Sequence, residues 1–288
     1  MPATNVSTRD GVKKDQRMTG HLPAENRQGW RSILVRMFGN RATLIHWDTL
    51  VLDRWLWVCE RLPRTSPAQM LCDVGCGTGS FTVGAALRGY TALGLSWDER
   101  NQRVAAERAA MCGAETSSFE VLDVRRLDSR ADLVSMFDVL LCTEVIEHIP
   151  DDGKILRDMA ACLKPGGRLL LTTPYQHYRA ITASDEGPFM MDRQDGWHVR
   201  RGYTEERLRE LCQQAGLSVH AISYCSGILS QKITYLLRTL SRVNTFVGLG
   251  AIMPLRILPP LFDGWLTKSL RWPFYSICLE ARKNSAEG

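Results

Sequence analysis

A group of acidic and histidine residues is the first feature of this sequence that could carry chemistry. Glu144, Glu147 and His148 stand together directly after a short apolar run, and His198 follows later in the chain. In a helical turn, residues three and four apart share one face, so Glu144 would align with Glu147 and His148. Two carboxylates and imidazoles that converge on one cleft can hold a divalent cation with open coordination positions. The four residues are therefore a candidate metal site, with Mg²⁺ the expected ion. The alternative is that they bond only to one another and to backbone groups.

A glycine-rich loop is the second candidate site. The stretch reads Leu71-Cys72-Asp73-Val74-Gly75-Cys76-Gly77-Thr78-Gly79, with three alternate glycines between an apolar run and a helical segment. Side chains at the glycine positions would keep a ligand away from the backbone, and the loop leads into the positive end of a helix. Ser80 stands where a nicotinamide-dinucleotide fingerprint has its last glycine. Asp73 before the loop suits a cationic amine better than a pyrophosphate.

The elements that must position these residues follow a repeating pattern after Pro67. Short apolar strands alternate with longer helical segments, which is typical of βαβ units and a parallel sheet. We expect strands at Met70–Val74, Thr91–Leu95, Phe119–Leu122, Phe137–Cys142, Arg168–Thr173, Leu217–Tyr224 and Phe274–Ala281. We expect helices between them at Phe81–Arg88, Asp98–Cys112, Lys154–Leu163 and Thr204–Ala215. Ligands of open α/β sheets bind at the carboxyl ends of the strands, where Glu144 follows the fourth strand.

With these residues in view, the stretch from Met70 to Tyr224 resembles the class I S-adenosylmethionine-dependent methyltransferases. The glycine loop matches their motif I, and Phe137–Cys142 matches their fourth strand. The resemblance implies an α/β fold with a Rossmann-like seven-stranded mixed sheet flanked by helices, and S-adenosyl-L-methionine as the cofactor. In that family the loop wraps the methionine part, an acidic residue matching Asp73 helps to hold the amino group, and one matching Asp123 binds the adenine amine. The implied cofactor-binding set is Asp73, Gly75, Cys76, Gly77, Gly79, Ser96, Trp97, Asp123, Val124 and Thr143.

One position departs from the family pattern. The second strand of the family usually ends in an acidic residue that holds both ribose hydroxyls, but Gly94-Leu95-Ser96 has serine there. A hydroxyl makes fewer such bonds than a carboxylate, so ribose binding would depend on Trp97 packing or on Asp98 reaching back. The alternative for Asp98 is that it caps the following helix.

The acidic and histidine group carries a second resemblance, to the E-x-x-E-H element of magnesium-dependent O-methyltransferases, including the ubiquinone-pathway enzymes. With the later histidine it also resembles the small-RNA 2′-O-methyltransferases. The resemblance implies a metal beside the transferable methyl group. Proton loss from a hydroxyl acceptor needs a metal or a base, for which His148, His198 and Glu144 are the candidates. The leading hypothesis is O-methylation of a small hydrophobic or glycosylated metabolite. The alternatives are metal-independent C- or N-methylation, and a non-catalytic cofactor-binding or RNA-binding module.

Five segments are expected along the chain. Residues 1–28 are polar without periodicity and predict a flexible tail, and 29–67 predict N-terminal helices that cover the cleft. Residues 68–226 form the methyltransferase core, and 273–288 hold the last strand and a tail. A long connection between Thr173 and Asp192 predicts a lid or substrate loop, with a surface loop as the alternative. Residues 227–272 are apolar and basic, and predict either a helical cap over the substrate or a peripheral membrane contact through 228–270.

Charge and composition narrow the class of protein. The chain has 288 residues and a net charge of +5. The basic excess lies between Gly227 and Pro273, so the remainder is neutral, which argues against nucleic acid as a partner. The nine cysteines form no C-x-x-C pair, the N-terminus does not resemble a signal peptide, and no uncharged run is long enough to span a bilayer. These features predict a cytoplasmic protein, peripheral to the membrane if 228–270 contacts lipid. They leave the oligomeric state open.

Overall fold

The central element is a mixed β-sheet. The computed structural model describes residues 18–19, 48–65, 68–189 and 198–284, and within them the strand order is β1-β4-β3-β2-β5-β6-β8-β7. The strands are β1 Met18–Thr19, β2 Met70–Val74, β3 Thr91–Ser96, β4 Ser117–Val121, β5 Phe137–Thr143, β6 Leu163–Pro174, β7 Leu217–Cys225 and β8 Ser276–Lys283. Strands β4, β3, β2, β5 and β6 are parallel, whereas β8 is antiparallel to both β6 and β7. The predicted seven-stranded mixed sheet is confirmed.

The short β1 extends this sheet by one edge strand. It pairs antiparallel with β4, through Met18 opposite Phe119 and Thr19 opposite Ser118. These two residues come from the segment for which we expected a flexible tail, and the other residues of that segment lie outside the described part of the chain. The expectation for them stays a prediction.

Continuous apolar runs form the central strands because both of their faces are covered. Leu71, Cys72 and Val74 of β2 are buried, and so are Leu140 and Leu141 of β5. The predicted bounds of β2 agree with the structure, but β6 begins five residues earlier than the predicted Arg168. The reason is that Leu163 already pairs with Phe137, so residues 164–167, which lie between the predicted helix and the predicted strand, belong to an irregular first part of β6.

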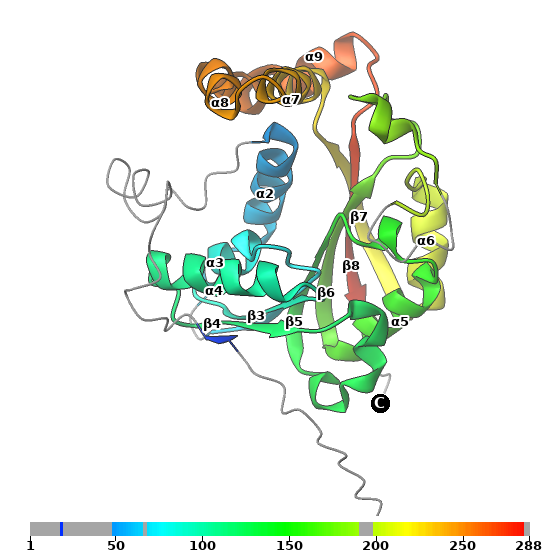
Figure 1. Cartoon of the computed structure of the whole chain (residues 1–288). Coiled ribbons are helices and arrows are strands. Elements are labelled where there is room, and N and C mark those ends of the chain that lie inside the picture. The colour runs from blue at the N-terminus through cyan, green and yellow to red at the C-terminus, as the bar shows by residue number, and fades with distance from the viewer. Residues whose placement is uncertain (1–17, 20–47, 66–67, 190–197, 285–288) are drawn as a thin grey trace, which may run out of the picture.

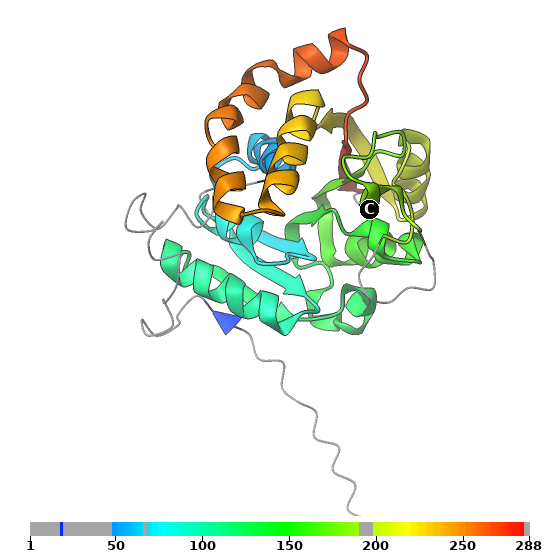
Figure 2. The ribbon, with the colours of Figure 1, turned by 45° about the horizontal axis from the view of Figure 1, so that its top comes forward.

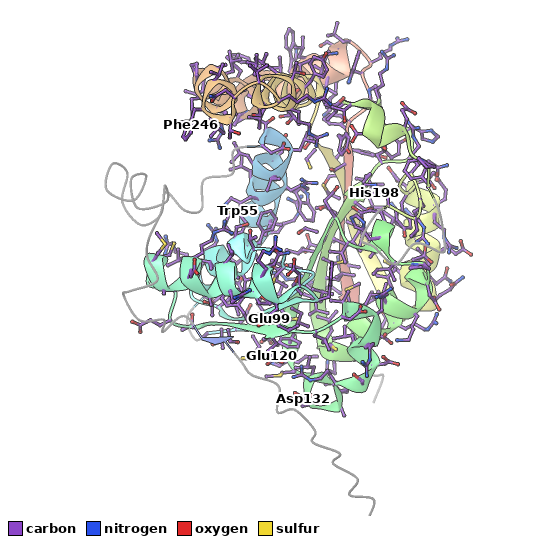
Figure 3. All side chains as sticks on the ribbon, viewed as in Figure 1. Trp55, Glu99, Glu120, Asp132, His198 and Phe246 are labelled. Carbon is purple, nitrogen blue, oxygen red and sulfur yellow. The ribbon has the colours of Figure 1, made fainter. Side chains whose placement is uncertain are left out.

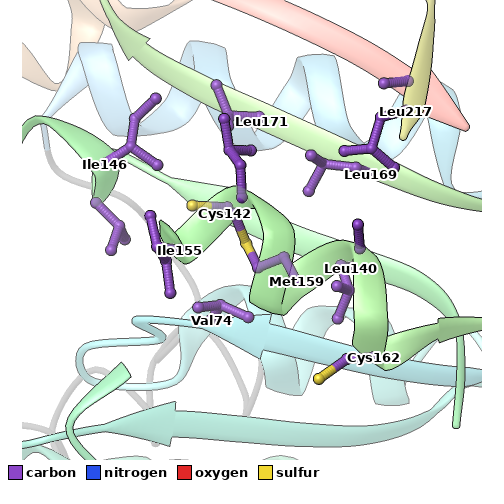
Figure 4. Packing of buried hydrophobic residues seen from close by; sticks show 14 of the residues in the cluster. Val74, Leu140, Cys142, Ile146, Ile155, Met159, Cys162, Leu169, Leu171 and Leu217 are labelled. Carbon is purple, nitrogen blue, oxygen red and sulfur yellow. The ribbon is translucent and has the colours of Figure 1, made fainter. Parts of the chain in front are cut away.

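Helices cover the sheet on both faces (Figure 1). The larger helices of this core are α2 Thr49–Arg61, α3 Ser80–Ala86, α4 Glu99–Cys112, α5 Asp152–Cys162 and α6 Glu205–Gln214. One apolar cluster joins α5 and α6 to the sheet, and Figure 4 shows Ile155 and Met159 of α5 against Leu140 and Leu171. A second cluster joins α2, α3 and α4 to the opposite face. The short helices of the connections are η3 Val124–Ser129, η4 Ala131–Leu133, η5 Ile146–His148 and η6 Ala183–Glu186.

Helix α2 is the described part of the predicted N-terminal helices. Asp48 caps its first turn by accepting a hydrogen bond from the Leu50 amide, and the helix packs on α3, where Trp55 lies 5.0 Å from Phe81 between ring centroids. The rest of the segment for which we predicted N-terminal helices, apart from 48–65, lies outside the described residues.

The predicted long connection after β6 is partly described. Tyr178 and Ile181 are buried against Leu50 of α2 and Tyr275, and η6 begins with a capping box between Thr182 and Asp185. The described part, up to residue 189, is therefore packed on the core, while residues 190–197 lie outside the described part of the chain.

Residues 228–269 form a separate layer of helices beyond α2 (Figure 1). The helices are α7 Ile228–Ser241, α8 Thr245–Ile252, η7 Pro254–Ile257, the π turn η8 Pro259–Asp263 and α9 Gly264–Ser269. Figure 2 shows this layer from above, with α7 beside the chain of shorter helices. Among the described residues no single helix has the length and apolar character needed to cross a membrane. One bent pair, Thr245–Ile257 with Pro259–Ser269, meets that requirement jointly at an angle of 44°.

Candidate active site

A pocket of about 250 Å³ opens at the carboxyl ends of β2, β3, β4 and β5. The order of the strands reverses between β2 and β5, which is the place where open α/β sheets bind ligands. The residues that line the pocket are Gly75, Gly77, Ser96, Trp97, Asn101, Asp123, Val124, Arg125, Glu144, Val145, His148 and Ile149. Eight of these positions belong to the predicted cofactor-binding or catalytic set, and the pocket brings the two sets together.

The three alternate glycines serve different purposes in the loop. All three have positive φ angles, of 80°, 53° and 70° for Gly75, Gly77 and Gly79. A Cβ atom at Gly75 would lie 2.5 Å from a methyl group of Val145, and one at Gly79 would lie 2.5 Å from Cβ of Ala105. A Cβ atom at Gly77 would meet nothing within 4 Å, because this residue faces the pocket. Packing thus requires two of the glycines, and Gly77 keeps space open for a ligand.

Asp73 lies under the loop with one oxygen that has no partner among the described residues. The side chain is 1% exposed, and its Oδ2 atom accepts a hydrogen bond of 2.8 Å from the Thr82 hydroxyl. Oδ1 is buried without a hydrogen bond. Burial raises the pKa of this carboxyl group to about 6. A buried carboxylate that lacks a partner is well suited to an ammonium group brought by a ligand.

Ser96 and Trp97 both line the pocket at the end of β3. Ser96 is buried, whereas Trp97 is 66% exposed, which leaves its indole ring free to pack on a ligand. Asp98 accepts a hydrogen bond of 2.8 Å from the Arg100 amide and caps α4, as its alternative interpretation predicted. Asn101, which the sequence interpretation missed, lines the pocket from the first turn of α4. Its position shortly after the serine that replaces the usual acidic residue was the available signal.

Asp123 lies on the other side of the pocket and forms an ion pair with Arg125. The shortest distance between them is 2.6 Å, and hydrogen bonds from Arg125 lower the pKa of the Asp123 carboxyl group. Arg125 also lines the pocket, and nothing in the sequence distinguished it from the neighbouring Arg126. A ligand amine at Asp123 would share the carboxylate with this guanidinium.

Four residues of the predicted cofactor set do not line the pocket, and Asp73, which lies under the loop, is one of them. Cys76 points beneath the loop, where its sulfur lies 3.6 Å from the side-chain oxygen of Gln102. Gly79 begins α3, and Thr143 ends β5 opposite Thr172. These residues support the loop and the strand end in the described structure.

Glu144 is held by Arg54 of α2. Its Oε2 atom lies 2.8 Å from the guanidinium, and Oε1 accepts longer hydrogen bonds from the hydroxyl groups of Thr172 and Ser276. Burial disfavours the charged form of Arg54, but the Glu144 carboxylate more than compensates and raises its pKa. Glu144 has a φ angle of 54° and precedes η5, so it does not share a helical face with Glu147 and His148. Its carboxylate contacts Arg54, Thr172 and Ser276 instead.

Glu147, His148 and His198 lie together, with ligand atoms within 4.8 Å of one another. Backbone hydrogen bonding brings the distant histidine here, because the Val199 amide donates to the Glu147 carbonyl oxygen. The rings of His148 and His198 meet edge to face with centroids 4.5 Å apart. Figure 3 shows His198 beside the sheet, away from α2. His148 lines the pocket, whereas His198 does not.

The electrostatic environment favours the neutral forms of Glu147 and His198. Burial lowers the pKa of His198 below its ordinary value of 6.5, and the neighbouring His148 contributes to the shift. Burial and the nearby Glu144 raise the pKa of Glu147 well above the ordinary value of 4.5. One oxygen of Glu147 accepts from Thr173, and the other lies 3.9 Å from His148 Nε2 without a hydrogen bond to a described residue.

The donor chemistry gives a partial match to a metal site. The predicted set of four ligands is not assembled, since Glu144 is occupied by Arg54 and lies outside the group of three. One carboxylate and two imidazoles suit a transition ion better than Mg²⁺, which prefers oxygen ligands. The Mg²⁺ site stays a prediction from the sequence.

The comparisons with known proteins agree with this geometry. A family model described as a methyltransferase domain matches residues 46–222. A ubiquinone biosynthesis O-methyltransferase of Pseudomonas putida (strain F1) is 30% identical over 174 residues, which cover 58% of this chain and 71% of that protein. The same enzyme of strain W619 is 31% identical over 120 residues, or 41% of this chain and 48% of the relative. The chain thus spans about half the length of the first curated relatives.

Solved structures show the same fold at low sequence identity. Phosphoethanolamine N-methyltransferase 2 of Haemonchus contortus, in complex with S-adenosyl-L-methionine, aligns with a TM-score of 0.57 at 18% identity and covers 91% of this chain and 61% of that one. The [4+2]-cyclase SpnF aligns with a TM-score of 0.54 at 19% identity and covers 90% and 85%. Together with the family match, the sheet order and the glycine loop, these findings make the chain a member of the class I S-adenosylmethionine-dependent methyltransferase family.

Proposed function

We propose that this enzyme transfers the methyl group of S-adenosyl-L-methionine to a hydroxyl oxygen of a small hydrophobic acceptor. The observation that carries the proposal is the His148–His198 pair, in which His148 lines the cofactor pocket and its ring contacts His198, whose pKa is lowered by burial. An oxygen acceptor must lose a proton, and a neutral imidazole in reach of the acceptor can take it. Amine and carbon acceptors also release a proton on methylation, so the choice of oxygen rests in addition on the relatives that are named for O-methylation.

The cofactor pocket has the groups that the proposal needs. Asp73 has a free oxygen for the amino group, Gly77 leaves room for the chain, and Trp97 and Asp123 flank the position of the adenosine. When bound, the cofactor supplies a methyl group that its sulfonium already activates. The protein then needs to position the acceptor and to exclude water, which accounts for most of the acceleration in such transfers.

His148 is the proposed proton acceptor because it lines the pocket, and His198 positions its ring. The edge-to-face contact and the Val199–Glu147 backbone hydrogen bond fix the pair. The low pKa of His198 keeps it neutral at neutral pH, so it does not repel a proton that moves onto His148.

The acceptor class rests on composition and on relatives. The P. putida relatives are named ubiquinone biosynthesis O-methyltransferases, and that name specifies methyl transfer to oxygen. We infer that the acceptor of this chain also has a hydroxyl group and an apolar body. The cytoplasmic location expected from the sequence, the division into domains and the glycosylated class of acceptor stay predictions.

A second mechanism uses a divalent ion at Glu147, His148 and His198. The specific observation in its favour is the buried oxygen of Glu147, which has no hydrogen-bond partner among the described residues and faces His148. An ion there would lower the pKa of an acceptor hydroxyl and orient it. The ligand set favours Mn²⁺ or a related transition ion over Mg²⁺.

Methyl-transfer assays separate these mechanisms. The acceptors are catechols with and without a polyprenyl tail, and the variants are His148→Ala, His198→Ala and, as the control, His220→Ala on the exposed part of β7. We expect turnover to fall about 100-fold or more for His148→Ala and to stay unchanged for His220→Ala.

Exhaustive chelation followed by addition of Mn²⁺ or Mg²⁺ tests the role of an ion. Activity that survives chelation removes the metal mechanism. Full activity of both His148→Ala and His198→Ala after chelation would contradict the proposal and favour C- or N-methylation.

A further inference from the structure

The bent helix pair after α7, Thr245–Ile257 with Pro259–Ser269, carries many exposed apolar side chains. Large apolar side chains are exposed in each of its helical segments, α8, η7, η8 and α9, and together they form an apolar stripe. The exposed apolar residues of the stripe are Phe246, Val247, Met253, Ile257, Leu261, Phe262 and Trp265. Phe246 is 76% exposed and Trp265 is 70% exposed. Figure 3 shows Phe246 at the outer end of this layer.

The inner face of the same pair carries polar groups. Asp263 and Thr267 are buried, and Asp263 accepts hydrogen bonds from the Leu229 and Ser230 amides at the first turn of α7. The Thr267 hydroxyl lies between Asp263 and the Ile228 amide. Gly248, Ile252 and Pro259 are buried beside them, so the pair docks to the protein through both polar and apolar groups, while large apolar side chains stay exposed on its outer side.

The pattern does not fit a cap that closes over the pocket. None of the described residues of 228–270 lines the pocket at the carboxyl ends of the strands. The extent of exposure also exceeds what scattered surface residues produce, since the stripe is continuous across α8, η7, η8 and α9.

Exposed basic residues accompany the stripe, and residues 228–272 contain no exposed acidic residue. Arg242, Lys268 and Arg271 are exposed, and none of them forms an ion pair with a carboxylate of the described residues. The one acidic residue between Gly227 and Pro273 is Asp263, which is buried. An apolar stripe bordered by cations complements a bilayer surface with anionic head groups.

We propose that the outer face of α8 to α9 lies in the interface of an anionic membrane, with Phe246, Ile257 and Trp265 in the acyl boundary. Arg242, Lys268 and Arg271 then meet the head groups. The pair lies in the plane of the interface and does not cross the bilayer, because its inner face is fixed to α7 by Asp263. The inference does not depend on the acceptor, although a membrane position would bring the pocket close to lipid-soluble molecules.

Vesicle co-sedimentation of the full chain tests the proposal. The probes are phosphatidylcholine vesicles with and without about 30% phosphatidylglycerol. The variant is the double substitution Phe246→Asp with Trp265→Asp, and the matched control is Val134→Asp, a 55% exposed residue beyond η4. Figure 3 shows Asp132 of η4 at the opposite end of the molecule from Phe246. Thermal melting and S-adenosyl-L-methionine affinity, both expected to stay unchanged, verify that the variants fold.

We expect the wild type and Val134→Asp to bind the anionic vesicles, and the double variant to bind at least about tenfold more weakly. Binding should weaken as the salt concentration is raised, and carbonate should extract the bound protein from the vesicles. Equal binding by the double variant and by Val134→Asp, or no binding by any form, would overturn the proposal. Resistance to carbonate extraction would replace the interfacial position with a membrane-spanning one.

Hydroxyl-radical footprinting distinguishes the other occupants of this face. We expect Phe246, Met253 and Trp265 to be reactive without vesicles and protected with anionic vesicles. Protection in the monomer without vesicles would mean that another part of this chain covers the face. Protection that appears only in a dimer, and a dimer lost in the double variant, would assign the face to a second copy. Tight RNA binding with a steep salt dependence and no vesicle binding would assign the cations to nucleic acid. Each of the last three results would contradict a membrane contact.

Discussion

Replacement of Gly77 by valine should abolish cofactor binding while the protein stays folded. At a φ angle of 53°, a side chain costs roughly 1–2 kcal/mol of folding free energy, and no described atom lies within 4 Å of the new Cβ. We therefore expect the melting temperature to fall by only about 2–8 °C. The branched side chain projects into the pocket, so the dissociation constant of S-adenosyl-L-methionine should rise about 100-fold or more, which is at least about 2.7 kcal/mol.

Gly113→Val is the matched control for this substitution. Gly113 ends α4 with a φ angle of 68°, and a Cβ atom there also meets nothing within 4 Å, but the residue does not line the pocket. The control should lose the same stability and keep its affinity for the cofactor. Isothermal titration calorimetry measures the affinity, and differential scanning calorimetry measures the stability. Wild-type affinity in Gly77→Val, or an equal loss of affinity in Gly113→Val, would refute the assigned role of Gly77.

Two further predictions concern charged groups near the pocket. The pKa of about 6 at Asp73 means that the carboxylate is protonated in more acidic solution, so its attraction for an ammonium group is present above that pH and lost as the pH falls. Cofactor affinity measured by calorimetry should be constant above pH 6 and fall by about tenfold per pH unit below it, whereas an Asp73→Asn variant should lose affinity and this pH dependence. Arg54→Ala leaves the Glu144 carboxylate buried without its cation and should cost roughly 3 kcal/mol in urea unfolding, with part of the loss recovered in the Arg54→Ala, Glu144→Ala double variant. Strictly additive losses in that double variant would contradict a direct pairing.

The core strands were predicted well from local patterns, because a short run of apolar residues indicates a strand that is buried on both faces. The apolar run Met70–Val74 is buried in the sheet as expected, and the loop after it has the required glycines. The position of the last strand between β6 and β7 could not be predicted. It depends on how the chain returns through the helices of residues 228–269, and no local pattern encodes that path.

The candidate site shows the same division between local and distant information. The trio of Glu147, His148 and His198 was found from residue types, although backbone hydrogen bonding had to bring the third member into place. The partner of Glu144 was not found, since Arg54 lies on a helix far earlier in the chain and an arginine on a helix gives no signal of an ion pair. The exposed apolar side of the last helices could be recognised only from the burial of each residue in the structure. Composition alone is the same for a substrate cap and for a membrane contact.

The central claim is methyl transfer from S-adenosyl-L-methionine to oxygen in the pocket beside His148. The most direct test uses cofactor labelled with ¹³C in its methyl group, the catechol acceptors and nuclear magnetic resonance of the product. We predict that the label appears as a methoxy carbon in the wild-type reaction and that its rate of appearance falls with His148→Ala but not with His220→Ala. A label attached to nitrogen or carbon, or a bound cofactor that gives methoxy product at an unchanged rate in His148→Ala, would contradict the account.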